Sequence, residues 1–323
     1  MSGLLDVQDL KVTLTTRQRS VEVVAGVDFH VGAGEIVGIV GESGSGKSVS
    51  ALSLVGLQAP PLHATGVAQF GDTELLSARE AALRAVRGRD IGLIFQDSLA
   101  GLHPMLTIER QITEPLFTHM DIKYDQARSR ARELLEQVRI PDAERALKRY
   151  PHEFSGGMRQ RIAIAAALAC GPRLLIADEP TTALDVTVQA GILRLLVELR
   201  RETGLAVLMI THDLGVLSAI ADRLYVFYGG RVVESGPMVE VIRRPRHPYT
   251  KALLDAVPRG GKETLKAIPG APAQPGGWPV GCVFAPRCAY ARDTCRAAEP
   301  ALALVEPERA LRCAVDPFAA RKA

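Results

Sequence analysis

The sequence contains no apolar run long enough to cross a membrane. Its longest apolar stretches, such as residues 162–171 and 205–210, fall far short of the ~20 residues that a membrane-spanning helix needs. The segment MSGLLDVQDL at the start also lacks the basic segment, apolar core and small-residue cleavage site of a secretory signal. We therefore expect a cytoplasmic protein without a membrane span of its own.

A strong net charge and a clustered basic stripe are absent as well. The 39 lysines and arginines and the 36 aspartates and glutamates leave a formal net charge of +3. With 47% hydrophobic and 23% charged residues, the composition is that of a soluble globular protein. Extensive disorder and nucleic-acid binding are therefore disfavoured. The 323 residues leave room for one large core with an appendage, or for two domains of about 150 residues each.

Proline is scarce until late in the chain, since 12 of the 20 prolines lie between residues 237 and 323. Before that point, short β-branched runs alternate with longer helical patterns, which predicts an α/β layer fold. The stretch from residue 96 to residue 170 has only helical and loop-like patterns and predicts an inserted helical subdomain. We expect strands at residues 35–40, 91–95, 173–178 and 205–211, helices at 46–57, 126–139, 158–170 and 187–201, and a hairpin at 224–235.

The most specific motif is GESGSGKS at residues 41–48, which matches the phosphate-loop pattern GxxxxGK[ST]. It follows an apolar strand and precedes a helical run, as this loop requires. Its glycines let backbone N–H groups surround a phosphate, while Lys47 reaches the β- and γ-phosphates and Ser48 ligates Mg²⁺. The residues expected to contact the nucleotide here are Gly41, Ser43, Gly44, Ser45, Gly46, Lys47, Ser48 and Val49.

Two other segments gain meaning beside this loop. Residues 174–180, LLIADEP, predict a strand that ends in Asp178, placed to hold Mg²⁺, and Glu179, a natural general base. Alone, such a strand end is as well explained by solvated carboxylates. Residues 155–157, Ser-Gly-Gly, open a helix and predict an anion site, although a plain N-cap by Ser155 would give the same pattern.

These motifs resemble those of the ATP-binding-cassette ATPases in order and spacing. The resemblance covers about residues 4–257 and rests on residues 41–48, 96, 155–160, 178–179, 183–185 and 211–213. It implies a P-loop NTPase fold, with a RecA-like core, a β-subdomain and a helical subdomain at about residues 97–170. Two such cassettes pack head to tail, so that each ATP lies between the phosphate loop of one and the Ser-Gly-Gly turn of the other.

The resemblance also implies residue roles. Glu179, His212 and Gln96 would be catalytic, and Ser48, Gln96 and Asp178 would lie at Mg²⁺. Ser155, Gly156 and Gly157 would act on the nucleotide across the dimer interface. Without the resemblance, His212 and Gln96 are as well explained as ordinary polar residues at the ends of strands. The aromatic residue that usually stacks on adenine is missing, because residues 1–28 contain none. We expect the base to rest on Arg17, Arg19, Val21 or Val23 instead.

Residues 246–254, RHPYTKALL, resemble the segment that follows the cassette in dipeptide, oligopeptide and nickel importers. The resemblance implies ATP hydrolysis that drives peptide import, with nickel or another small solute as the alternative. It implies two transmembrane permease subunits, a second ATPase subunit in a heterodimer, an extracytoplasmic solute-binding protein, and a peripheral position at the cytoplasmic face of the plasma membrane. A soluble ABC-type ATPase without a permease is the rival from another class.

Four of the five cysteines lie in the proline-rich tail, which we take as residues 258–323 after a cassette of residues 1–257. The tail has too few large apolar side chains for a core of its own, which favours a metal or covalent staple. Thiolates at Cys282, Cys288, Cys295 and Cys313 suit a [4Fe–4S] cluster or Zn²⁺, and free or redox-linked thiols stay possible. Some members of the importer subfamily hold a [4Fe–4S] cluster at such cysteines, so a cluster is expected. Cys170 is expected to be a buried apolar residue.

Overall fold

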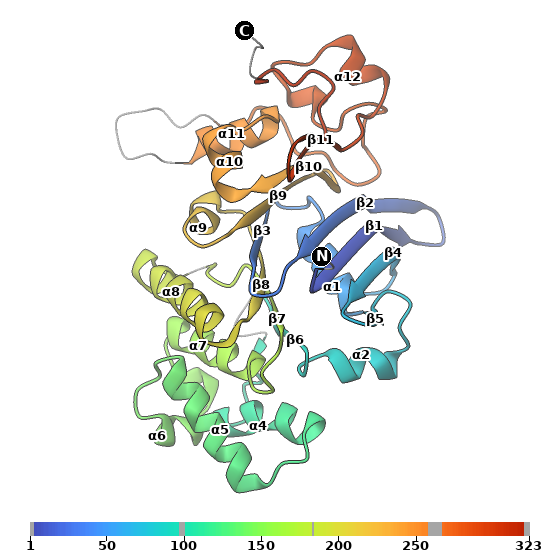
Figure 1. Ribbon diagram of the computed structural model, residues 1–323. Coiled ribbons are helices and arrows are strands. Elements are labelled where there is room, and N and C mark those ends of the chain that lie inside the picture. Colours follow the sequence, from blue (N-terminus) through green and yellow to red (C-terminus); the bar gives the residue numbers. More distant parts are fainter. Residues whose placement is uncertain (1–2, 97–100, 183, 258–266, 320–323) are drawn as a thin grey trace. The chain divides into compact units, whose positions relative to one another are not determined.

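The computed structural model describes residues 3–96, 101–182, 184–257 and 267–319 (Figure 1). The chain forms two compact units, each made of segments distant in sequence. The first unit comprises residues 1–30, 36–77 and 211–323, and the second comprises residues 31–35 and 78–210. Within the described residues, no helix combines the length and the apolar character needed to cross a membrane.

The first unit contains a four-stranded antiparallel sheet in the order β2-β1-β4-β5, formed by β1 (Leu5–Thr15), β2 (Ser20–Val31), β4 (Leu62–Phe70) and β5 (Thr73–Glu74). Strand β1 buries Leu5 and Val7, and then Leu10 and Val12. The buried positions thus change from odd-numbered to even-numbered residues, and the change occurs at a β-bulge, a register shift between Gln8 and Lys11. One extra residue at such a bulge moves the following side chains to the other face, so both halves of β1 contribute to the core.

The same unit contains five further strands in the order β11-β12-β10-β9-β3. Strand β3 (Ile36–Val40) is buried along its whole length and runs parallel to β9 (Arg223–Tyr228). Strand β9 forms the predicted hairpin with β10 (Arg231–Pro237), and Gly229 and Gly230 make the turn with φ of 53° and 73°. Positive φ at both turn residues is what a two-residue hairpin requires. The helices of this unit are α1 (Lys47–Leu54), α9 (Leu214–Ser218), α10 (Met238–Arg243), α11 (Pro248–Ala256), η2 (Ala285–Arg287) and α12 (Asp293–Ala297).

The second unit contains the parallel strands β6 (Ile91–Ile94), β7 (Leu174–Asp178) and β8 (Ala206–Thr211), with β7 in the middle. The predicted helical insertion lies between β6 and β7; its first residues, 97–100, fall outside the described ones. Helix α8 turns Ile192, Leu195, Leu196 and Leu199 inward at helical spacing. The helices with fully described bounds in this unit are α2 (Glu80–Val86), α4 (Ile108–His119), α5 (Tyr124–Gln137), α6 (Ala143–Leu147), η1 (Pro151–Glu153), α7 (Gly156–Ala167) and α8 (Val186–Thr203).

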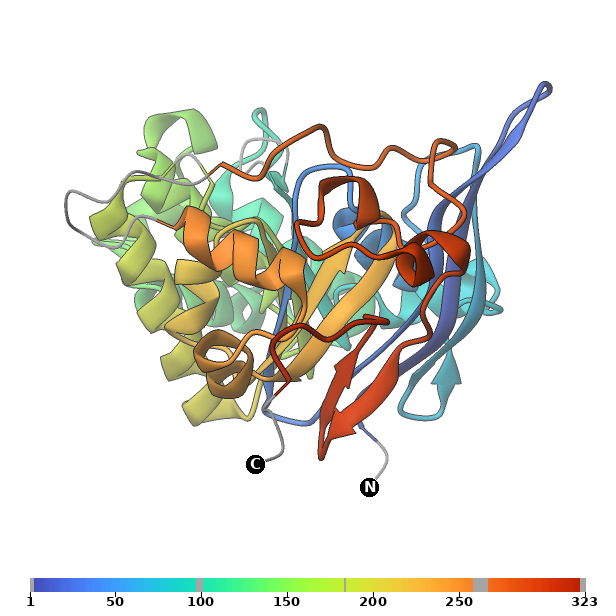
Figure 2. The same ribbon diagram turned by 90° about the horizontal axis from the view of Figure 1, so that it is seen from above.

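The proline-rich tail contains two strands that the sequence does not predict. Strands β11 (Ala303–Glu306) and β12 (Arg309–Leu311) extend the sheet, because β12 pairs with β10 (Figure 2). The guanidinium of Arg309 lies 2.7 Å from the carboxylate of Glu234 on β10, and both side chains are at most 1% exposed. Few apolar side chains of the described part of the tail are buried, and one of them, Phe284, packs against Tyr228 and Tyr249 of the cassette segments.

Replacing Arg309 with Met should destabilise the protein by about 3 kcal/mol, because the buried carboxylate of Glu234 would lose its charged partner and keep only the backbone N–H groups of Arg246 and His247. Urea or thermal unfolding followed by circular dichroism measures this change. Adding Glu234→Gln should recover part of the loss. Glu240→Gln, which removes an exposed ion pair with Arg244, is the control and should not move the midpoint. An unchanged midpoint for Arg309→Met would contradict a stabilising role of the buried pair.

Candidate functional site

The phosphate loop, residues 41–48, joins β3 to α1 in the first unit. Because β3 ends buried at Val40, the chain must turn sharply before α1 begins at Lys47. Gly44 and Gly46 make this turn with φ of 77° and 97°, which residues with a side chain rarely adopt. The predicted phosphate loop thus has the strand–turn–helix context that its motif requires.

Two glycines of this loop are required by close packing. A Cβ atom at Gly41 would lie 2.2 Å from the carbonyl oxygen of Phe227 on β9. A Cβ atom at Gly46 would lie 3.0 Å from Cγ2 of Val24 and 3.2 Å from the carbonyl oxygen of Val23. The loop backbone is therefore in direct contact with the neighbouring strands, which hold its shape.

Lys47 lies along the inside of the loop and is 5% exposed. Its Nζ donates to the carbonyl oxygens of Gly41 at 2.7 Å and Glu42 at 2.8 Å, and lies 3.4 Å from Oγ of Ser45. These carbonyl oxygens hold its ammonium group inside the loop. Of the other predicted contacts, Ser43 and Gly44 are exposed, and Ser48 and Val49 are half-buried.

Glu179 and Gln96, both predicted as catalytic, meet in the second unit. Oε2 of Glu179 accepts hydrogen bonds from Nε2 of Gln96 at 3.2 Å and from Oγ1 of Thr182 at 2.8 Å. Glu179 has a φ of 47°, a backbone strain found at functional sites, and Asp178 lies buried just before it at the end of β7. Sequence reasoning missed Thr182; its only sequence signal was a hydroxyl three residues after the glutamate.

The Ser-Gly-Gly turn begins α7 in the second unit. Oγ of Ser155 accepts a hydrogen bond from the backbone N–H of Met158 at 3.4 Å, so Ser155 is the N-cap of α7. Ser155 is exposed, and Gly156 and Gly157 are half-buried. A Cβ atom at Gly157 would lie 2.5 Å from Cγ1 of Val188 on α8, so close helix packing requires this glycine. The turn leaves the positive end of the helix dipole next to an exposed hydroxyl.

His212 directly follows β8 and is exposed. The next residue, Asp213, caps α9 by accepting the backbone N–H of Gly215 at 2.7 Å. The expected adenine contacts Arg17 and Arg19 are exposed near the turn between β1 and β2. Cγ1 of Val21 lies 3.2 Å from the Cβ position of Gly276, so a tail segment covers a residue expected at the base. The adenine contact stays a prediction.

The four tail cysteines line one small pocket in the first unit, with a cavity volume of about 10 Å³. Burial raises the pKa of Cys282 to about 11 and also raises the pKa values of Cys288 and Cys313. Nevertheless, in the described part of the chain no three histidine, cysteine or acidic side chains are arranged to hold a metal ion. Cys170 is buried, as expected.

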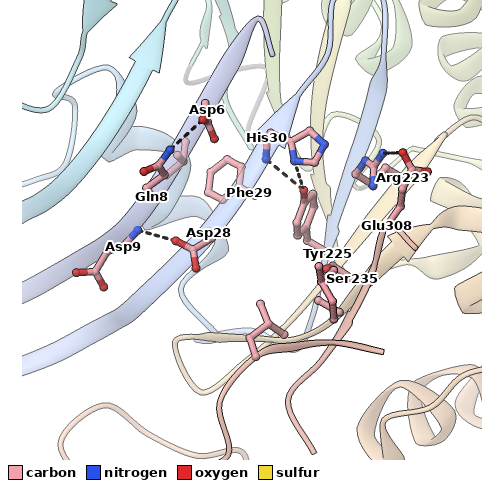
Figure 3. A pocket seen from close by; sticks show the side chains of 14 residues that line it. Asp6, Gln8, Asp9, Asp28, Phe29, His30, Arg223, Tyr225, Ser235 and Glu308 are labelled. Carbon is pink, nitrogen blue, oxygen red and sulfur yellow. Dashed lines mark hydrogen bonds and ion pairs between the residues drawn. The ribbon is translucent and has the colours of Figure 1, made fainter. Parts of the chain in front are cut away.

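A hollow of about 620 Å³ in the first unit contains none of the predicted site residues (Figure 3). Here the backbone N–H of His30 donates to the hydroxyl of Tyr225 at 3.2 Å, and the backbone N–H of Asp9 donates to Asp28 at 2.7 Å. Arg223 pairs with Glu308 of the tail at 3.7 Å. Size alone therefore does not mark the functional site of this chain.

Two family models match the sequence. The model described as ABC transporter matches residues 24–182, and the one described as Oligopeptide/dipeptide transporter, C-terminal region, matches residues 233–295. A putative peptide import ATP-binding protein of Brucella melitensis is 48% identical over 325 residues, which cover 96% of each chain. The chain belongs to the ABC transporter family. It is a cassette that binds ATP and hydrolyses it, and the predicted fold class is confirmed.

Other relatives of this ABC ATPase carry similar names. The oligopeptide transport ATP-binding protein AppD of Bacillus subtilis is 46% identical, with 97% of each chain covered. OppD of Escherichia coli, with the same description, is 47% identical over 92% of this chain and 89% of the relative. The ATP-binding cassette MJ0796, solved as a dimer bound to ADP and Pi, has a TM-score of 0.65 and 29% identity, and it covers 72% of this chain and 98% of that one.

Gly41→Ala should weaken nucleotide binding by the ABC ATPase, because the added Cβ would overlap the carbonyl oxygen of Phe227 and displace the loop. Titration with a fluorescent ATP analogue should show a loss of at least about tenfold in affinity, equivalent to about 1.4 kcal/mol. Gly44→Ala is the control, because no atom of the described residues lies within 4 Å of its Cβ position. It bears only the strain of a positive φ, so its loss should be smaller. Equal losses in the two variants would refute the packing constraint.

Proposed function

We propose that this ABC ATPase energises the import of di- or oligopeptides through a separate membrane permease. The match of residues 233–295 to the oligopeptide/dipeptide transporter region carries this proposal. Relatives named for peptide import or oligopeptide transport align with nearly the whole chain and support it. Nickel or another small solute is the alternative cargo. A soluble ABC ATPase that works without a permease is disfavoured, because residues 233–295 match a region described for transporters.

The proposed assembly contains two transmembrane permease subunits, a second ATPase subunit and, on the far side of the membrane, a solute-binding protein. The ATPase itself would sit at the cytoplasmic face of the plasma membrane. The Ser-Gly-Gly-Met sequence at residues 155–158 resembles that of the first of two unlike ATPase subunits in such importers, whose second subunit typically has glutamine in place of Met158. We therefore propose a heterodimer.

Within one nucleotide site, we propose that the N–H groups of the phosphate loop and Lys47 bind the phosphates of ATP. Mg²⁺, when bound, neutralises phosphate charge, and hydroxyl, carboxylate and amide oxygens of Ser48, Asp178 and Gln96 are ligand types that it takes. Glu179 would accept a proton from the attacking water, with Gln96 and Thr182 orienting its carboxylate through their hydrogen bonds. His212 would donate a hydrogen bond to the γ-phosphate, and Ser155, Gly156 and Gly157 would bind the nucleotide of the partner ATPase.

Transport by the assembled complex tests the proposal. Vesicles containing the ATPase, its partner ATPase and the permease should take up a labelled dipeptide or oligopeptide when ATP is supplied. Glu179→Gln should keep ATP binding but lower hydrolysis and uptake by at least about a hundredfold, because the general base is lost. Radiolabelled uptake and phosphate release measure the two effects.

The matched control is Glu198→Gln, which removes a carboxylate of the same unit that pairs with Arg139 at the surface. It should leave hydrolysis unchanged. Near-normal hydrolysis by Glu179→Gln would refute the assigned base. Uptake of Ni²⁺ but not of peptides would overturn the proposed cargo and leave the ATPase role intact.

We also propose a [4Fe–4S] cluster at Cys282, Cys288, Cys295 and Cys313, with Zn²⁺ as the alternative. Four thiols lining one pocket are the donors that such a cluster takes. Because burial raises the pKa of three of them, these thiols stay protonated at neutral pH unless a metal displaces the protons. The side chains would have to draw together to ligate the cluster.

Protein purified without oxygen should be brown and contain about four irons per chain. Cys295→Ser should lower the iron content and the visible absorbance. Cys170→Ala should not, because Cys170 is buried outside the pocket. Colourless protein with one zinc per chain would overturn the cluster in favour of Zn²⁺.

A further inference from the structure

The second residue of the phosphate loop, Glu42, is held by the tail. Nη1 of Arg287 lies 2.6 Å from Oε2 of Glu42, and Nη2 lies 3.0 Å from Oε1. The side chain of Arg287 is only 5% exposed. This two-pronged pair joins residues 245 positions apart in the sequence. Paired N–H donors of this kind fix the orientation of a carboxylate as well as its charge.

Arg287 is itself firmly placed. Its Nε donates to the carbonyl oxygen of Pro269 at 2.8 Å, and Nη2 donates to that of Ile268 at 3.3 Å. Nη1 also donates to the hydroxyl of Tyr228 at 3.3 Å. The hydrogen bonds to Glu42 raise the pKa of Arg287 above its usual value, so the guanidinium stays charged. The tail therefore presents a fixed positive charge to the loop.

A second contact holds the backbone of the same residue. The N–H of Glu42 donates to the hydroxyl of Tyr249 on α11 at 2.8 Å. Tyr249 is fully buried, and its ring lies 4.6 Å from that of Tyr228 and 5.3 Å from that of Phe284 of the tail, measured between centroids. Both the side chain and the backbone N–H of Glu42 are thus held by residues beyond position 227.

The electrostatic position of Glu42 gives this contact a consequence for binding. The carbonyl oxygen of Glu42 accepts a hydrogen bond from Nζ of Lys47, the group assigned to the phosphates. A free carboxylate so near the loop would repel a triphosphate and compete for Lys47. Bound to Arg287, the carboxylate is neutralised and cannot turn toward either.

We propose that Arg287 is a positioning residue for nucleotide binding, which acts by neutralising Glu42 and holding it away from the phosphates. Arg287 touches neither ATP nor the reacting atoms. The proposal rests on the assignment of residues 41–48 as the phosphate site. It makes the tail part of the nucleotide-binding apparatus through one ion pair.

The test compares Mg·ATP dissociation constants of the full-length chain. Arg287→Gln should weaken binding about tenfold, because Glu42 becomes an unpaired negative charge beside the loop. Adding Glu42→Gln should restore the affinity to within about threefold of the wild type, because the repelling charge is gone although the ion pair is still missing. In the assembled transporter, Arg287→Gln should raise KM for ATP about tenfold and change kcat less than twofold.

Asp316→Asn is the matched control, since Asp316 pairs with Arg246 in another two-pronged contact of the tail. It should leave ATP affinity unchanged. The proposal is overturned if Arg287→Gln binds ATP normally, or if the double variant binds as weakly as the single one, which would mean that the pair only anchors the tail. Lys47→Ala tests the underlying assignment separately. Unaltered ATP affinity in that variant would contradict the assignment of residues 41–48 as the phosphate site.

Discussion

The close approach of the phosphate loop to the β9–β10 hairpin is the contact on which the first unit depends. Gly41 has no room for a side chain against Phe227, and the backbone N–H of Gly230 donates to the carbonyl oxygen of Ser45 at 3.1 Å. On its other edge, the hairpin pairs with β12 of the tail. The loop therefore has the shape that its glycines permit and that the hairpin imposes, and the tail extends the sheet at the other edge of that hairpin.

Buried and half-buried arginines make the joint between tail and cassette segments. Besides the pair of Arg287 with Glu42, Arg231 of the cassette pairs with Glu299 of the tail, and Arg309 of the tail pairs with Glu234 of the cassette. Arg231 also lies over the ring of Trp278, 4.3 Å from its centroid. Ion pairs removed from water add little stability compared with apolar packing, but an unpaired member is costly, so they favour one arrangement over all others. A tail with few apolar side chains is thus placed by charge.

Much of this fold can be predicted from sequence, for reasons visible in particular elements. Strands β3, β7 and β8 are continuous apolar runs because they are buried on both faces, and the phosphate loop has a fixed spacing of glycine and lysine. Strands β11 and β12 were missed because strands of four and three residues have no periodicity to read. Contacts between distant positions were equally hidden: Gln96 meets Glu179 across 83 positions, and Arg287 meets Glu42 across 245.

The pairing of Glu42 with Arg287 bears on how such a cassette can be exchanged between transporters. The sequence motifs place the end of the cassette at about residue 257. A hybrid ATPase designed from them would join the cassette of one protein to the tail of another at that position. Such a hybrid would combine this loop with the tail of another protein. Glu42 would then lack the arginine with which it pairs here. The exchangeable part is therefore the cassette together with its tail, inherited as one piece.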